Sequence, residues 1–133
     1  MAPTFKARVL IVDDETAIVD FITNILSNCG FDIRVAYNGE QAVSIAREFH
    51  PDCVVTGFMM PGMDGIQEAT AILQFHPTCK FVFVTSNAQN PLLREPYERL
   101  GLDLNLLLDK PFERLDILNA LAMAGFSCSP KSS

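Results

Sequence analysis

Short, largely apolar runs alternate along this chain with longer segments in which apolar residues return every three or four positions. The first pattern is typical of strands buried on both faces, and the second of amphipathic helices. The runs predict strands over residues 7–12, 31–36, 53–57, 80–85 and 104–108. The periodic segments predict helices over residues 15–29, 41–49, 66–75 and 113–124.

Two of these helices carry more specific expectations. Asp14 stands just before the first helix, where its carboxylate is placed to cap the amino terminus. The inward face of the last helix is expected to comprise Leu115, Leu118 and either Leu121 or Ala122.

The segment from Ser86 to Leu100 should hold one more helix, but Pro91 and Pro96 interrupt it. A proline inside a helix removes a backbone donor and clashes with the preceding turn, at a cost of about 3 kcal/mol. This helix is therefore expected to be short, or to begin near Pro96 with that residue in its first turn.

Five strands that alternate with five helices predict an α/β fold with a parallel sheet covered on both faces. Because crossovers are right-handed, few topologies remain. We expect a flavodoxin-like, doubly wound (βα)5 fold with strand order 2-1-3-4-5. The expected organisation is a lead-in over residues 1–6, one domain over 7–125 and a flexible tail over 126–133.

Length, composition and net charge argue against some classes of function. The chain has 133 residues, of which 49% are hydrophobic and 20% charged, as expected for one globular domain. Its formal net charge of −6 argues against a nucleic-acid-binding surface. No apolar run approaches the roughly 18 residues that would span a bilayer, so we expect no membrane insertion.

The four cysteines show none of the paired spacings that indicate a disulfide framework or a metal site. We therefore expect free thiols in a reducing cytoplasm. The cysteines are Cys29, Cys53, Cys79 and Cys128.

Polar residues follow the predicted strands at the point where each strand ends. Asp13 and Asp14 follow the first strand, Thr85 ends the fourth and Lys110 comes just after the fifth. In the expected order, the carboxyl ends of these strands meet at one edge of the sheet. Two carboxylates suit Mg²⁺, and a lysine with a hydroxyl suits phosphoryl oxygens. The pattern predicts a phosphoryl and Mg²⁺ pocket.

At these positions the sequence resembles the receiver domain of bacterial two-component response regulators, of the chemotaxis-regulator type. The resemblance rests on four stretches that keep the family's order from about Arg8 to Ala124. They are Val12-Asp13-Asp14-Glu15, Pro51-Asp52 through Met59-Met60-Pro61-Gly62-Met63-Asp64-Gly65, Val84-Thr85-Ser86, and Lys110-Pro111-Phe112.

The resemblance implies a role for each matching residue. Asp13 and Asp14 would hold Mg²⁺, with Asp14 the more direct ligand, and the backbone carbonyl of Met59 would complete the metal site. Thr85 would be the hydroxyl that turns toward the phosphoryl group. Lys110 would contact the phosphoryl oxygens.

The family's phosphoacceptor aspartate falls on Gly57, which has no carboxylate. Its neighbours offer no replacement, because Thr56 should point to the other face of the strand. Asp52 lies at the far end of that strand, and Asp64 lies beyond the Pro-Gly loop. Leu107 is a second departure, since receivers usually carry a switch aromatic there.

The sequence therefore predicts a pseudo-receiver that acts as a protein-interaction module and not as an enzyme. Its expected partners are a sensor histidine kinase or other signalling proteins, and we expect a monomer or weak dimer, because the prolines before Leu100 disturb the usual dimer face. We further expect Lys110 to pair directly with Asp13 or Asp14, which leaves at most a weak Mg²⁺ site and a fixed conformation.

Two other interpretations stay open. One is a normal phospho-accepting receiver disabled by a substitution at Gly57. The other, more remote, is a flavodoxin-like cofactor carrier. The run Asp13-Asp14-Glu15 argues against the carrier, because it would repel a phosphate where a flavin carrier has a phosphate-binding loop.

Overall fold

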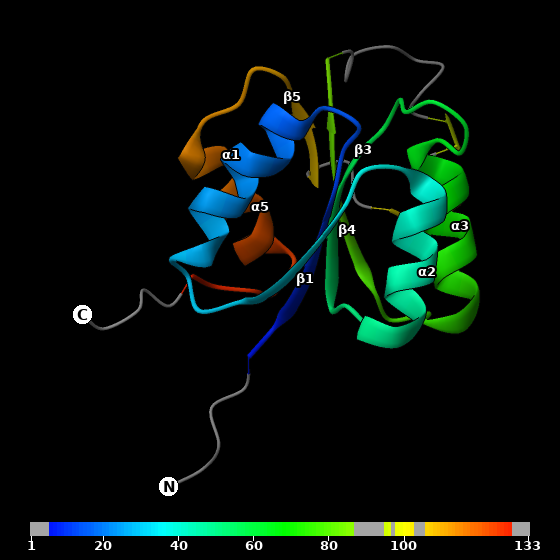
Figure 1. The fold of residues 1–133 in the computed structure, drawn as a ribbon, viewed down its shortest axis with the longest axis horizontal. Coiled ribbons are helices and arrows are strands. Elements are labelled where there is room, and N and C mark those ends of the chain that lie inside the picture. The colour runs from blue at the N-terminus through cyan, green and yellow to red at the C-terminus, as the bar shows by residue number, and fades with distance from the viewer. Residues whose placement is uncertain (1–5, 87–94, 97, 103–105, 129–133) are drawn as a thin grey trace, which may run out of the picture.

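The computed structural model describes residues 6–86, 95–96, 98–102 and 106–128. Its five strands form one parallel sheet in the order β2-β1-β3-β4-β5, as the alternation of elements predicted. Helices cover both faces of this sheet (Figure 1). The α/β, flavodoxin-like architecture is therefore confirmed.

The three central strands are the most apolar. They are β1 (Arg8–Val12), β3 (Cys53–Gly57) and β4 (Lys80–Thr85), and every residue after the first in β1 and β4 is buried. The outer strands β2 (Asp32–Ala36) and β5 (Leu107–Asp109) are more exposed, which is expected at the margins of a sheet.

Four helices with both ends in the described residues connect or follow the strands. They are α1 (Thr16–Ser27), α2 (Gly39–Phe49), α3 (Gly65–Phe75) and α5 (Arg114–Met123). The predicted bounds hold to within about three residues at each end. Most of the segment between Ser86 and Leu100, where a proline-interrupted helix was predicted, lies outside the described residues.

Two hydrophobic cores lie on opposite faces of the sheet. The α1/α5 core joins those two helices to strand residues Val9, Ile11, Val55, Val82 and Val84. The α2/α3 core joins the other two helices to Leu10, Val12, Val54, Phe81 and Phe83. Figure 1 shows α1 and α5 on one side of the strands and α2 and α3 on the other.

Two local predictions about the helices were wrong. Glu15, and not Asp14, occupies the N-cap position of α1, and no side chain caps that helix. Leu115, predicted to face inward, is 64% exposed, whereas Ile117 and Ala120 are buried. The predicted face began at Leu115, whereas the buried face includes Ile117, Ala120 and Leu121.

The prediction of four free thiols was also wrong. Cys29, just after α1, and Cys128, just after α5, form a disulfide across 99 positions of sequence. Cys53 and Cys79 are free and buried. A search for short cysteine spacings misses this pair, because the fold and not the sequence brings the two residues together.

Candidate functional site

The carboxyl ends of the strands bring the candidate residues to one edge of the sheet, as predicted. Asp13 directly follows β1, Gly57 ends β3, and Thr85 ends β4. Thr85 is paired in register with Asp109 of β5, and its carbonyl oxygen accepts a hydrogen bond of 2.7 Å from the backbone N–H of Lys110. The ladder between β4 and β5 therefore fixes where Lys110 leaves the sheet.

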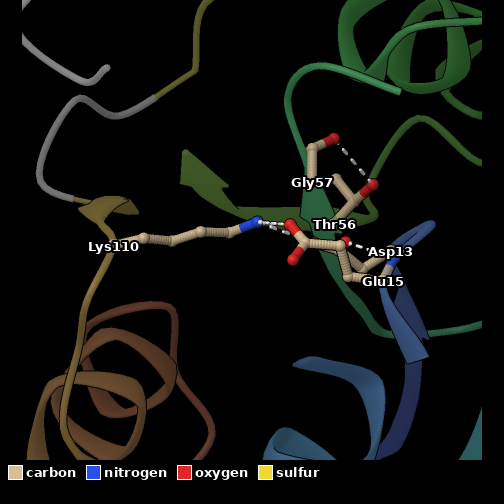
Figure 2. A network of polar contacts seen from close by, with 5 residues as sticks. All are labelled: Asp13, Glu15, Thr56, Gly57 and Lys110. Carbon is tan, nitrogen blue, oxygen red and sulfur yellow. Dashed lines mark hydrogen bonds and ion pairs between the residues drawn. The ribbon is translucent and has the colours of Figure 1, made fainter. Parts of the chain in front are cut away.

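Lys110 reaches across the strand ends to two acidic side chains (Figure 2). Its Nζ lies 3.3 Å from Asp13 Oδ2 and 3.2 Å from Glu15 Oε1. The backbone N–H of Glu15 donates to Asp13 Oδ1 at 2.9 Å. Asp13 thus has both carboxylate oxygens engaged within a three-residue network.

Burial sets the electrostatics of this network. Asp13 is 1% exposed, and desolvation raises the pKa of its carboxyl above the ordinary value. The N–H of Glu15 and the ammonium of Lys110 act in the opposite direction, because both favour the charged carboxylate. Lys110 therefore serves as the counter-ion of a carboxylate that has little contact with water.

The side-chain position of Gly57 faces this carboxylate. A Cβ added to Gly57 would lie 2.9 Å from Asp13 Oδ2 and 3.6 Å from Met60 Cγ. Thr56 faces the opposite side of β3, where its hydroxyl lies 3.0 Å from Glu68 Oε2 of α3. The two neighbours thus follow the alternation that the sequence predicted, and Thr56 does not point toward Asp13 (Figure 2).

The other predicted site residues differ in exposure. Asp14 is exposed, and the side chain of Met59 is 69% exposed. Thr85 is buried, and Leu107 is half-buried against the α2/α3 core.

Sequence reasoning missed Glu15 as a partner of Lys110. Its position as the third acid of the run after β1 was the signal available. The run had been interpreted as an acidic pair followed by the start of a helix.

Within the described part of the chain, no group of three or more histidine, cysteine, aspartate or glutamate side chains gathers as a metal site would require. Asp13 is already paired with a lysine, and Gly57 supplies no oxygen from a side chain.

The comparisons with known proteins decide the family. The profile of the response regulator receiver domain matches residues 9–122. This chain belongs to that family. As a receiver domain, it is a signalling module of two-component systems and not an enzyme. No helix in the described residues is long and apolar enough to cross a membrane.

Two curated relatives illustrate the match. The chain is 30% identical to the chemotaxis protein CheY of Thermotoga maritima over 115 residues, which cover 86% of this chain and 93% of CheY. It is 41% identical to the DNA-binding response regulator MtrA of Mycobacterium tuberculosis over 63 residues, which cover 47% of this chain and 28% of MtrA. The match to MtrA thus spans under a third of that longer regulator.

Solved structures agree on the fold. Vibrio cholerae CheY4 superimposes with a TM-score of 0.82 at 23% identity, covering 90% of this chain and 99% of CheY4. A chain of the CheX–CheY–BeF3–Mg²⁺ complex from Borrelia burgdorferi gives 0.80 at 27% identity, covering 91% and 90%. In that complex, a CheY protein is found together with CheX, BeF3 and Mg²⁺.

Proposed function

We propose that this chain is a pseudo-receiver: a receiver domain that takes up no phosphoryl group at the family's usual position and acts as a protein-interaction module in phosphorelay signalling. The observation that carries the proposal is the environment of Gly57. It ends β3, its side-chain direction points at the buried Asp13 carboxylate, and it has no side-chain oxygen with which to attack phosphorus.

The position of Lys110 supports a fixed conformation. In the family, the matching lysine contacts the phosphoryl group, and Thr85 would supply the switch hydroxyl. Here the Lys110 ammonium is held by Asp13 and Glu15 without any phosphoryl group. We infer that this pairing occupies the contacts through which phosphorylation would otherwise act, and that Leu107 replaces the family's switch aromatic.

For Mg²⁺ we propose at most a weak site formed by Asp13, Asp14 and the backbone carbonyl of Met59. A hard cation needs several oxygen ligands, usually including carboxylates. To bind here it would have to compete with Lys110 for Asp13, without help from a carboxylate at Gly57. The residues present therefore fit the ion poorly.

The module is proposed to work in the cytoplasm, as a monomer or weak dimer, and to bind a sensor histidine kinase or another signalling protein. The net charge of −6 argues against a nucleic-acid-binding role for this domain. Its regulation would come from something other than an aspartyl phosphate.

The test is to incubate the protein with Mg²⁺ and either acetyl phosphate or beryllofluoride, and to follow mass and NMR shifts. The unaltered chain should gain no phosphoryl mass and show no saturable shifts around Thr85. Gly57→Asp should form an acyl phosphate, provided that the Asp13 carboxylate rotates away from the new Cβ.

Gly57→Asn is the matched control, because it has nearly the size of aspartate but no nucleophilic carboxylate. Saturable shifts around Thr85 in the unaltered chain that require acetyl phosphate or beryllofluoride together with Mg²⁺ would overturn the proposal. Gly57→Asp also tests the alternative of a normal receiver disabled by a substitution at Gly57. Full phosphorylation of this variant would mean that the rest of the pocket is intact, as that alternative requires.

A further inference from the structure

The disulfide between Cys29 and Cys128 lies away from the candidate site. The site is at the carboxyl edge of the sheet, whereas Cys29 follows the far end of α1, close to the start of β2. Figure 1 shows the segment after α5 passing this end of α1. We call residues 125–128 the C-terminal strap.

The strap is tied to the two helices in different ways. Its described hydrogen bonds go to α5, where Gly125 N–H donates to Ala122 O at 3.0 Å and Phe126 N–H donates to Leu121 O at 2.8 Å. Phe126 and Cys128 also pack, partly buried, on the α1/α5 core. The link from the end of the strap to α1 is the disulfide itself, so breaking that bond removes the covalent tie between strap and α1.

The two sulfurs differ in access. Cys29 is 1% exposed, whereas Cys128 is only partly buried. Cys128 is therefore the more exposed residue of the pair and the one that an external thiolate is expected to attack. The free cysteines are poor competitors, because burial raises the pKa of the Cys79 thiol to about 12 and that of Cys53 well above its ordinary value.

We propose that Cys29–Cys128 is a thiol-exchange site for a dithiol protein of the thioredoxin class, and that its reduction releases the C-terminal strap from α1. The interpretation of the bond as reversible rests on the cytoplasmic location proposed above, because disulfides in that compartment are usually transient and regulatory. It does not depend on the state of Gly57.

The exchange balances as a two-electron step. A thiolate of the reductant attacks Cys128 Sγ, the Cys29–Cys128 bond breaks, and the Cys29 sulfur leaves and takes up a proton. The second thiol of the reductant then attacks the mixed disulfide, which leaves an oxidised reductant and a free Cys128. The Cys29 sulfur lies 3.7 Å from the carbonyl oxygen of Ile25, which can accept a hydrogen bond from the thiol formed.

The test uses the folded protein with thioredoxin, its reductase and NADPH. Non-reducing peptide mapping should find the Cys29–Cys128 cross-link, and NADPH should be consumed without denaturant at one equivalent per chain. Hydrogen exchange in the strap and in the last turn of α1 should then accelerate about tenfold, with α2 and α3 unchanged.

Two variants accompany the wild type. Cys128→Ser should consume no NADPH and should show fast strap exchange from the start. Cys79→Ala is the matched control, since it removes a free buried thiol and should leave reduction at the wild-type rate. If Cys128→Ser fails to fold, the reduced wild-type protein takes its place in the measurement of strap hydrogen exchange.

Three results would overturn the inference. The first is the absence of the cross-linked peptide. The second is reduction only after denaturant is added, which would make the disulfide a structural link closed to exchange. The third is unchanged strap exchange after reduction. None of these bears on the phosphorylation test, so the two proposals fail separately.

Discussion

Glu68 is a fully buried carboxyl group on α3 that the sequence did not mark as unusual. Thr56 Oγ1 lies 3.0 Å from Glu68 Oε2 and 3.2 Å from the Gly57 carbonyl oxygen. A single hydroxyl proton cannot serve both acceptors well. A protonated Glu68 resolves this, because it donates to Thr56 while Thr56 donates to Gly57.

This arrangement predicts a pH-dependent stability. Burial raises the pKa of Glu68 to about 8. The unfolded chain loses this proton near the ordinary value of 4.5. The stabilisation from Glu68 is therefore complete below pH 4.5 and is lost as the pH rises to about 8, at up to about 1.4 kcal/mol per pH unit.

Glu68→Gln should flatten that slope, because a glutamine amide donates to Thr56 at any pH. Urea unfolding followed by circular dichroism at a series of pH values gives the comparison. Glu48→Gln, at an exposed position on α2, is the control and should keep the wild-type slope. A wild-type stability that rises between pH 5.5 and 8 would contradict the assignment.

At the scale of the element, the start of α3 is what positions Glu68. Asp64 caps the helix by accepting from Gln67 N–H at 2.8 Å, and Gln67 Oε1 accepts from Asp64 N–H at 2.9 Å. Gly65 then passes very close to β3, with its N–H donating to Phe58 O at 2.8 Å. The helix is thus attached to the strand end that carries Gly57.

Gly65→Ala should be strongly unfavourable for this contact. The added Cβ would lie 2.5 Å from the Gly57 carbonyl oxygen and 2.9 Å from the Phe83 ring, and the first of these is backbone that cannot rotate away. We expect a loss of about 1–3 kcal/mol in the free energy of unfolding, as for other overpacked sites.

Gln74→Ala is the matched control for that loss, since Gln74 is exposed on the same helix and should change the stability by less than about 0.5 kcal/mol. If urea unfolding gave the same stability for Gly65→Ala and wild type, α3 would lie farther from β3 than it does in the structure.

At the scale of the whole molecule, the central strands of the sheet were the easiest part to predict. The bounds of β4 were predicted without error, because a strand covered by helices on both faces is apolar throughout. The exposure of Leu115 was not predicted, since several registers of α5 bury a comparable amount of apolar surface. A pairing of Lys110 with Asp13 or Asp14 was predicted from charge and from the expected strand order, and the structure has the Asp13 pair. The Cys29–Cys128 bond needed the three-dimensional arrangement.

The two cores share one sheet, which predicts how the molecule unfolds. Val54 and Val55 are consecutive, fully buried residues of β3, yet Val54 belongs to the α2/α3 core and Val55 to the α1/α5 core. Both cores pack against the same hydrogen-bonded strands, β1, β3 and β4. If the strands separate on one face of the sheet, the core on the other face is therefore lost as well.

Val54→Ala and Val55→Ala should therefore each lower the stability of both cores together, by about 1–3 kcal/mol. Methyl NMR in a urea series separates the two faces, and probes on both should report the same midpoint in each variant. Ser44→Ala, at an exposed site on α2, should leave the midpoint in place. If Val54→Ala shifted only the probes of the α2/α3 core, the faces would unfold independently, and β3 would not couple them.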